Sequence, residues 1–102
     1  MNWNDQKDNR YIFTVSELNN SAKKTLENSF SDIWIKGEIS NFKSYPSGHW
    51  YFTLKDEESQ IQCVMFKFKN SLLNFTPKEG DEFIALGSAS MYLARGNYQF
   101  QV

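Results

Sequence analysis

The sequence has only one cysteine, one histidine and two prolines among its 102 residues. With Cys63 alone, the chain cannot form an internal disulfide or a cysteine-based metal cluster, which is typical of proteins in a reducing compartment. His49 has no obvious acidic partner and cannot by itself supply the several ligands that a zinc hydrolase needs. We therefore expect no catalytic residue, no metal ion and no cofactor in this sequence.

The sequence also lacks a long hydrophobic run. No stretch approaches the roughly 18 consecutive apolar residues of a membrane span, and the N-terminus lacks the basic start and apolar middle of a signal peptide. We therefore expect a cytoplasmic protein that does not bind membranes. The length is that of one domain. Residues 1–10 show no periodic pattern and predict a flexible leader, so the folded domain is expected at residues 11–102.

A strong charge of either sign is absent as well. Eleven basic and 12 acidic residues give a net charge of −1, which argues against a strongly basic, sequence-independent nucleic-acid binder. However, six of the acidic residues fall in two predicted turns, at 56–58 and 79–82. Six basic residues can then share one face with only Glu38 close to them, namely Lys36, Lys43, Lys55, Lys67, Lys69 and Arg95. Local charge therefore leaves a nucleic-acid partner open.

One amphipathic helix is predicted near the N-terminus. Thr14 and Glu17 have the spacing of a capping box, and apolar residues then recur every three or four positions as far as Phe30. This pattern predicts a helix at about residues 15–28. We expect the polar face of this helix to be exposed to water.

After the helix, the hydrophobic period changes to two residues, which is typical of half-buried strands. Gly37, inside the first strand, predicts a bend or bulge. The pattern predicts a strand from Ile33, a turn-rich loop at 41–48, strands at 49–55 and 60–66, a short helical segment within 67–76, and strands at 83–92 and 97–102. This order is that of the OB-fold, a five-stranded Greek-key barrel, here preceded by an α-helix. An SH3-like barrel is the nearest alternative.

One face of the hairpin formed by the second and third strands mixes stacking, hydrogen-bonding and charged groups. The face consists of His49, Tyr51, Thr53 and Lys55 on one strand and Gln60, Gln62, Val64 and Phe66 on the next. Unpaired bases stack on aromatic rings, cations contact phosphates and amides read base edges. Tyr51, Lys55 and Gln62 supply one group of each kind. Ordinary cross-strand packing of Tyr51 and Phe66 is the alternative interpretation.

Two loops beside this face carry similar groups. OB-folds usually bind through the surface of strands two and three and through the loops that join strands one to two and four to five. The first loop contains Asn41, Phe42 and Lys43, and the second carries Tyr92, Arg95 and Tyr98 around a glycine. We therefore predict that single-stranded nucleic acid binds over this face and these two loops.

Five segments resemble, in their order and spacing, the start of the large subunit of bacterial exodeoxyribonuclease VII: TVSELN, IWIKGEISNFK, SGHWYFTLKD, QIQCVMFK and RGNYQ. The resemblance covers about residues 12–102. It implies the N-terminal OB-fold domain of a nuclease subunit that degrades single-stranded DNA to oligonucleotides. It also implies a partner, the small subunit of that enzyme, which binds other regions of the large subunit, and catalytic residues that lie outside this sequence.

The resemblance further implies that the domain holds the DNA strand. The contacts carried over by motif are Lys36, Asn41, Phe42, His49, Tyr51, Lys55, Gln62, Arg95 and Tyr98. Phe42 and Tyr51 are expected to stack on bases, and Lys36, Lys55 and Arg95 to contact phosphates. The alternative is a protein-interaction or assembly barrel in the same kind of complex, in which the same aromatic residues pack against another domain or subunit.

Overall fold

The N-terminal helix α1 (Val15–Ser29) begins at the capping box that the sequence predicts. In the computed structural model, which describes residues 10–102, the Glu17 N–H donates to Thr14 Oγ1 at 3.1 Å and the Thr14 N–H donates to Glu17 Oε1 at 2.8 Å. These bonds satisfy two N–H groups for which the helix itself has no acceptor. The predicted leader falls almost entirely outside the described residues.

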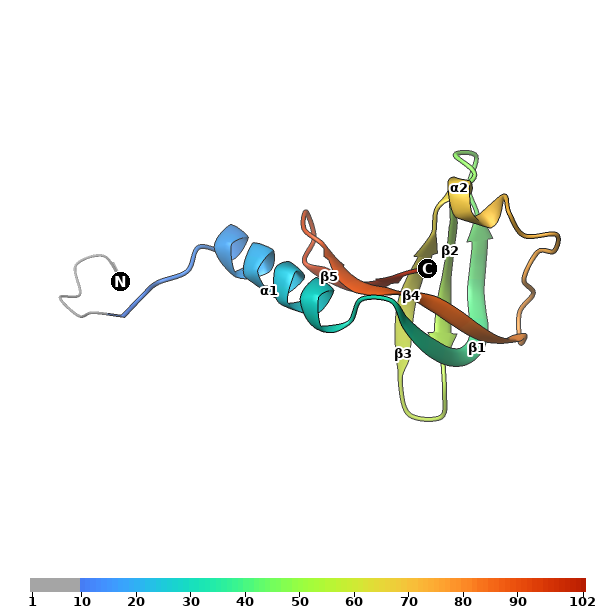
Figure 1. Ribbon diagram of the computed structural model, residues 1–102, viewed down its shortest axis with the longest axis horizontal. Helices are drawn as coiled ribbons and strands as arrows, with labels where there is room; N and C mark the ends of the chain where they lie inside the picture. The colour runs from blue at the N-terminus through green and yellow to red at the C-terminus, as the bar shows by residue number, and fades with distance from the viewer. Residues whose placement is uncertain (1–9) are drawn as a thin grey trace.

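Five strands close into a barrel in the order β1-β2-β3-β5-β4 (Figure 1). They are β1 (Ile33–Ser44), β2 (Trp50–Lys55), β3 (Gln60–Met65), β4 (Glu82–Tyr92) and β5 (Asn97–Gln101). All neighbouring strands pair antiparallel except β3 and β5, which run parallel. The short helix α2 (Lys67–Asn70) lies between β3 and β4. This arrangement confirms the mainly β fold, with its helical insertion after the third strand, that the sequence predicts.

Strand β1 belongs to two sides of the barrel because it changes partner near Gly37. Residues Ile33–Glu38 pair with β4, and residues Glu38–Ser44 pair with β2. A Cβ atom at Gly37 would lie 3.1 Å from the Lys55 carbonyl oxygen and 3.2 Å from Leu54 Cβ. A larger side chain would therefore push β1 away from β2, which explains the glycine at the predicted bend.

The barrel interior is filled by side chains from all five strands: Ile39, Trp50, Phe52, Leu54, Cys63, Ala85 and Phe100. Cys63 is a small buried core residue. Helix α2, shorter than the predicted segment, lies over one end of the barrel (Figure 1). The Asn70 side-chain amide fixes it there by donating to the carbonyl oxygens of Gly48 (2.8 Å) and Met65 (3.2 Å). Leu73, just beyond the helix, packs against the core.

The first strand is longer than predicted, because it continues through residues 41–44 instead of ending before a loop. Its register against β2 shifts there, so that Asn41 and Phe42 together lie opposite the single residue Phe52. This is a β-bulge. Asn41 takes a φ of +53°, a left-handed conformation that asparagine tolerates better than most residues. The bulge turns Phe42 toward the inside of the barrel.

Helix α1 packs on β4 with its C-terminal part and approaches the tip of the β4–β5 hairpin at Asn19. The Ser90 hydroxyl of β4 donates to Glu27 Oε2 at 2.8 Å, so the polar face that was expected to be exposed to water is partly in contact with the sheet. The N-terminal turns extend beyond the barrel (Figure 1), and Val15 and Leu18 are exposed.

Within residues 10–102, no helix is long and apolar enough to cross a membrane.

Candidate nucleic-acid interface

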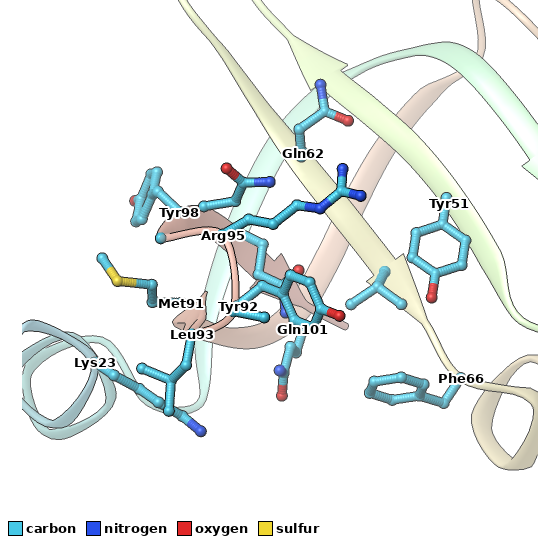
Figure 2. Close-up of a pocket in the computed structure, with 15 residues that line it drawn as sticks. Lys23, Tyr51, Gln62, Phe66, Met91, Tyr92, Leu93, Arg95, Tyr98 and Gln101 are labelled. Atoms are coloured by element: carbon cyan, nitrogen blue, oxygen red, sulfur yellow. The ribbon is translucent and has the colours of Figure 1, made fainter. Parts of the chain in front are cut away.

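An open groove of about 1050 Å³ runs between β3 and the loop that joins β4 to β5 (Figure 2). It exists because β3 and β5 pair at only two positions, Cys63 with Phe100 and Val64 with Gln101. Beyond these positions β5 continues with β4 as a hairpin that leads away from β3 (Figure 1). The groove therefore lies beside the shortest strand pairing of the barrel, the one between β3 and β5.

The walls of the groove combine aromatic rings, amides and cations. The rings of Tyr51, Tyr92 and Tyr98 are exposed, and that of Phe66 is half-buried. The amides and cations come from Gln62, Asn97, Gln99, Gln101, Lys23 and Arg95. Among the described residues that line the groove, none is acidic. Stacking rings, amides and cations along one groove are the groups that single-strand sites use.

Arg95 reaches into the groove from the tip of the β4–β5 hairpin. In the turn, the Arg95 N–H donates to the Tyr92 carbonyl oxygen at 3.3 Å. Figure 2 shows the Arg95 side chain extending across the groove, with its guanidinium on the side of Gln62 and Tyr51. Because a guanidinium is always charged in proteins, this position offers a permanent cation beside groups that contact bases.

Lys23 of α1 is a second cation in the groove, and it was not among the predicted site residues. The hairpin tip lies against the helix, because a Cβ atom at Gly96 would be 3.2 Å from the side-chain nitrogen of Asn19. The helix is also tied to β4 through Glu27 and Ser90. Local periodicity identifies the helix but not the strand it packs on, so it contains no signal for Lys23.

Five of the predicted site residues line the groove: Tyr51, Gln62, Phe66, Arg95 and Tyr98. Lys43 lies at its edge, because it is directly opposite Tyr51 in the β1–β2 register and shares its outward face. Tyr92 and Gln101 also line the groove and were not among the predicted site residues. The sequence placed Tyr92 in the second loop beside Arg95, whereas no local pattern pointed to Gln101.

Lys36 and Lys55 lie apart from this groove. They border a second hollow of about 480 Å³ at an end of the barrel, together with apolar side chains such as Ile35 and Ile61. Tyr98 borders both hollows. The two lysines therefore lie outside the groove that contains Arg95, and Tyr98 is the residue that the two hollows share.

Phe42 does not have the exposed position that stacking on a base requires. Its ring centroid lies 5.3 Å from that of Trp50 and 6.3 Å from that of Phe52, and the ring packs against the core. The cause is the bulge at Asn41, which adds one residue and reverses the alternation of inward and outward side chains. In the structure Phe42 therefore packs on the core side of the barrel and does not line the groove.

Thr53 and Val64 are not exposed either, although strand alternation places them on the outer face. Thr53 is 2% exposed, and the Gln62 side-chain amide donates to its Oγ1 at 3.1 Å. Val64 is covered where β5 pairs with β3, and its carbonyl oxygen accepts from the Val102 N–H at 3.0 Å. The predicted DNA contact of Thr53 is therefore wrong.

His49 supports the groove from outside it. Its Nδ1 accepts from the Lys67 N–H at 3.0 Å, and its ring packs edge-on against that of Phe66, with centroids 5.2 Å apart. Since Phe66 lines the groove, His49 holds part of the wall without facing the groove itself. Asn41, exposed at the bulge, also lies outside the groove.

In the acidic turn between β2 and β3, the Asp56 carboxylate stabilises the backbone of the turn. Asp56 Oδ1 accepts from the N–H groups of Glu58 and Ser59, both at 2.9 Å. These hydrogen bonds, chiefly that from Glu58, hold the pKa of the Asp56 carboxyl below its usual range. In the part of the chain that the structure describes, no three His, Cys, Asp or Glu side chains gather where they could hold a metal ion.

Residues 13–102 match the family described as the OB-fold nucleic acid binding domain. Similar proteins include exodeoxyribonuclease 7 large subunits from three bacteria. That of Nitrosomonas europaea is 48% identical over 93 residues, which are 91% of this chain and 21% of that protein. Those of Haemophilus influenzae and Shewanella denitrificans are 49% and 50% identical over 88 residues, 86% of this chain and 20% of each protein. The chain thus spans about a fifth of the length of these relatives. With this match over most of its length and the barrel described above, the chain belongs to the family of OB-fold nucleic acid binding domains.

Proposed function

We propose that this domain binds single-stranded DNA in the groove between β3 and the β4–β5 loop. The observation that carries the proposal is the arrangement of Tyr51, Tyr92 and Arg95, two exposed rings and one cation that face the same groove. Stacking on such rings requires unpaired bases, so the groove favours single strands over a duplex. The relatives are named as exodeoxyribonuclease large subunits, which supports DNA as the ligand.

In this proposal the two tyrosines stack on bases, Arg95 contacts a phosphate, and the Gln62 amide hydrogen-bonds a base edge. Tyr51 is held in place by Tyr45, whose ring meets it edge-on at a centroid distance of 5.1 Å. Lys23 and Lys43 add one charge each inside and beside the groove. Three phosphate contacts predict that log K falls with log salt concentration with a slope of about −2.

For the longer protein, the proposal makes this domain the part of a nuclease that holds the substrate strand. Degradation of single-stranded DNA, association with a small subunit and a cytoplasmic location belong to the same proposal. What supports them is the similarity to exodeoxyribonuclease 7 large subunits over about a fifth of their length. The groove provides a binding surface, and catalysis is assigned to other regions.

Fluorescence anisotropy of labelled single-stranded oligonucleotides, at low and moderate salt and with a duplex of the same sequence, tests the proposal. We expect saturable, salt-sensitive binding of the single strand only. Tyr51→Ala should lower the affinity about tenfold, since one stacked base contributes about 1 to 3 kcal/mol. Tyr11→Ala, an exposed tyrosine outside the groove, is the matched control. Equal affinity for duplex and single strand, or no effect of Tyr51→Ala, would contradict the proposal.

A second candidate function is a barrel that packs against another domain of the longer protein. One observation favours it: on the outer face of β1 and β4, Trp34 is 67% exposed and lies directly opposite the exposed Leu86, with Ile84 exposed nearby. Exposed apolar patches mark interaction sites. None of these side chains lines the groove, so Trp34→Ser should leave oligonucleotide affinity unchanged. If this function holds, the substitution should lower the melting temperature of the longer protein but not that of the domain alone.

A further inference from the structure

The aromatic wall of the groove continues outside it. The rings of Phe66 and Phe68 are nearly parallel, with an interplanar angle of 8° and centroids 6.2 Å apart. Phe66 lines the groove, whereas Phe68 lies beyond it and is 68% exposed. Phe66 and Gln101 also border the shallow hollow that contains Phe68 and Lys69. The groove and this hollow therefore adjoin, with Phe66 and Gln101 common to both.

The segment that carries Phe68 is firmly attached to the barrel. Asn70, two residues on, is buried and donates to the carbonyl oxygens of Gly48 and Met65. Lys67, one residue before, donates its N–H to His49 Nδ1 at 3.0 Å. Phe68 is thus an exposed ring on an ordered backbone, and a base can stack on it without first ordering a loop.

Two lysines flank this ring. Successive residues of a helix are about 100° apart around its axis, so Lys67 and Lys69 leave α2 on opposite sides of Phe68. On one side the aliphatic part of Lys67 lies over Gly48, where a Cβ atom would be 2.8 Å from Lys67 Cδ. On the other side Lys69 borders the hollow. A nucleotide inside a single strand also has one phosphate before it and one after it. Two cations on either side of one stacking ring therefore match this arrangement.

We propose that the bound strand leaves the groove at Phe66 and continues onto Phe68, where one further base stacks while Lys67 and Lys69 contact the phosphates on either side of it. A single exposed phenylalanine needs no explanation. Here the parallel neighbouring ring, the two flanking cations and the shared border with the groove together point to a nucleic-acid surface. Asp32 also borders the hollow, and its N–H donates to Ser88 Oγ of β4 at 3.1 Å. The acidic group therefore lies toward β4, and the strand passes over Phe68 instead.

This inference rests on the proposed function, and oligonucleotide length separates the two. OB-folds cover about 4 to 16 nucleotides, so a thymidine oligonucleotide of about 4 nucleotides fills the groove only, and one of about 10 reaches Phe68 as well. Anisotropy should show that Phe68→Ala weakens binding of the long oligonucleotide about tenfold and leaves the short one unchanged. Phe68→Trp, which keeps a stacking ring, should restore it. Leu72→Ala, an exposed apolar control on the same segment, should change neither.

The salt dependence tests the two lysines. Lys67→Gln together with Lys69→Gln should make the slope of log K against log salt shallower by about 1.4 for the long oligonucleotide, since each contact with a single strand contributes about 0.7. The short oligonucleotide should keep its slope. Lys78→Gln, an exposed lysine on the β3–β4 connection, is the matched control and should keep both slopes.

The possible results are distinct. If Phe68→Ala binds both oligonucleotides like the unmodified protein while Tyr51→Ala weakens both, the path over Phe68 is overturned and the proposed function stands. If Phe68→Ala weakens the short oligonucleotide as much as the long one, the ring belongs to the groove and the extension is again overturned. If the unmodified protein binds neither oligonucleotide, the proposed function fails and the inference fails with it. Selective loss of the long oligonucleotide supports both.

Discussion

Gln62 and Thr53 are joined across the β2–β3 hairpin, where the Gln62 side-chain amide donates to Thr53 Oγ1 at 3.1 Å. Thr53 is buried, and Gln62 lines the groove. Thr53, which a ligand cannot reach, therefore orients the Gln62 amide, which a ligand can contact. This relationship makes Thr53 a positioning residue for the proposed site.

Replacing Thr53 by valine, which has nearly the same shape, tests this role. We expect the free energy of unfolding to fall by about 1 kcal/mol, because the hydrogen bond of the buried Thr53 hydroxyl is lost. We also expect oligonucleotide affinity to fall several-fold, because the Gln62 amide is no longer held. Urea denaturation and anisotropy measure the two effects. Thr76→Val, at an exposed position, is the control, and unchanged affinity in Thr53→Val would contradict the positioning role.

Local rules predicted most of the fold correctly. The capping box of Thr14 and Glu17 defined the start of α1, and strand alternation located the barrel strands. The bend at Gly37 was also predicted from sequence. The bulge at Asn41 was not, because its left-handed φ is a property of one residue and a turn was an equally good interpretation of the polar segment around it. The closure of β3 with β5 depends on long-range pairing that no local pattern contains.

The candidate site was predicted in part. The alternation of side chains along β2 and β3 correctly placed Tyr51 and Gln62 on the outer face of the hairpin. It held there because the two strands pair residue by residue without a bulge. Alternation failed for Thr53, which its neighbours cover. For Phe42 the error had another source, because residues 41–44 were predicted as a loop and in fact continue β1 through a bulge. Alternation contained no information on Lys23, because helix packing on the β4–β5 hairpin is a tertiary property.

Phe42→Ala should behave as a core variant. The ring lies against Trp50 and Phe52, so its removal should lower the free energy of unfolding by about 3 kcal/mol, the lower end of the range for phenylalanine because Phe42 is only half-buried. Under conditions where the variant remains folded, we expect oligonucleotide affinity within about twofold of the unmodified protein. Urea denaturation followed by anisotropy checks both. A large loss of affinity with unchanged stability would show that the ring contacts DNA.

Tyr45→Ala should weaken DNA binding through Tyr51. The two rings meet edge-on at 5.1 Å, and Tyr45 does not line the groove. An edge-to-face pair contributes about 0.5 to 1.5 kcal/mol, so loss of this support should lower affinity by less than Tyr51→Ala does. The double variant Tyr45→Ala, Tyr51→Ala should bind no more weakly than Tyr51→Ala alone. If the two losses add fully, Tyr45 contacts DNA independently.

The buried thiol of Cys63 should make stability depend on pH in the alkaline range. Burial raises the pKa of Cys63 from its ordinary value of 9.0 to about 12. Above pH 9 the unfolded chain therefore releases a proton that the folded protein keeps, which favours unfolding. The free energy of unfolding should fall between about pH 9 and 12 by more in the unmodified protein than in Cys63→Ala, with no such difference between pH 6 and 8. Urea denaturation of both proteins at pH 7 and pH 10 measures it. A pH-independent difference between them would mean that the thiol ionises as readily in the folded barrel as in the unfolded chain.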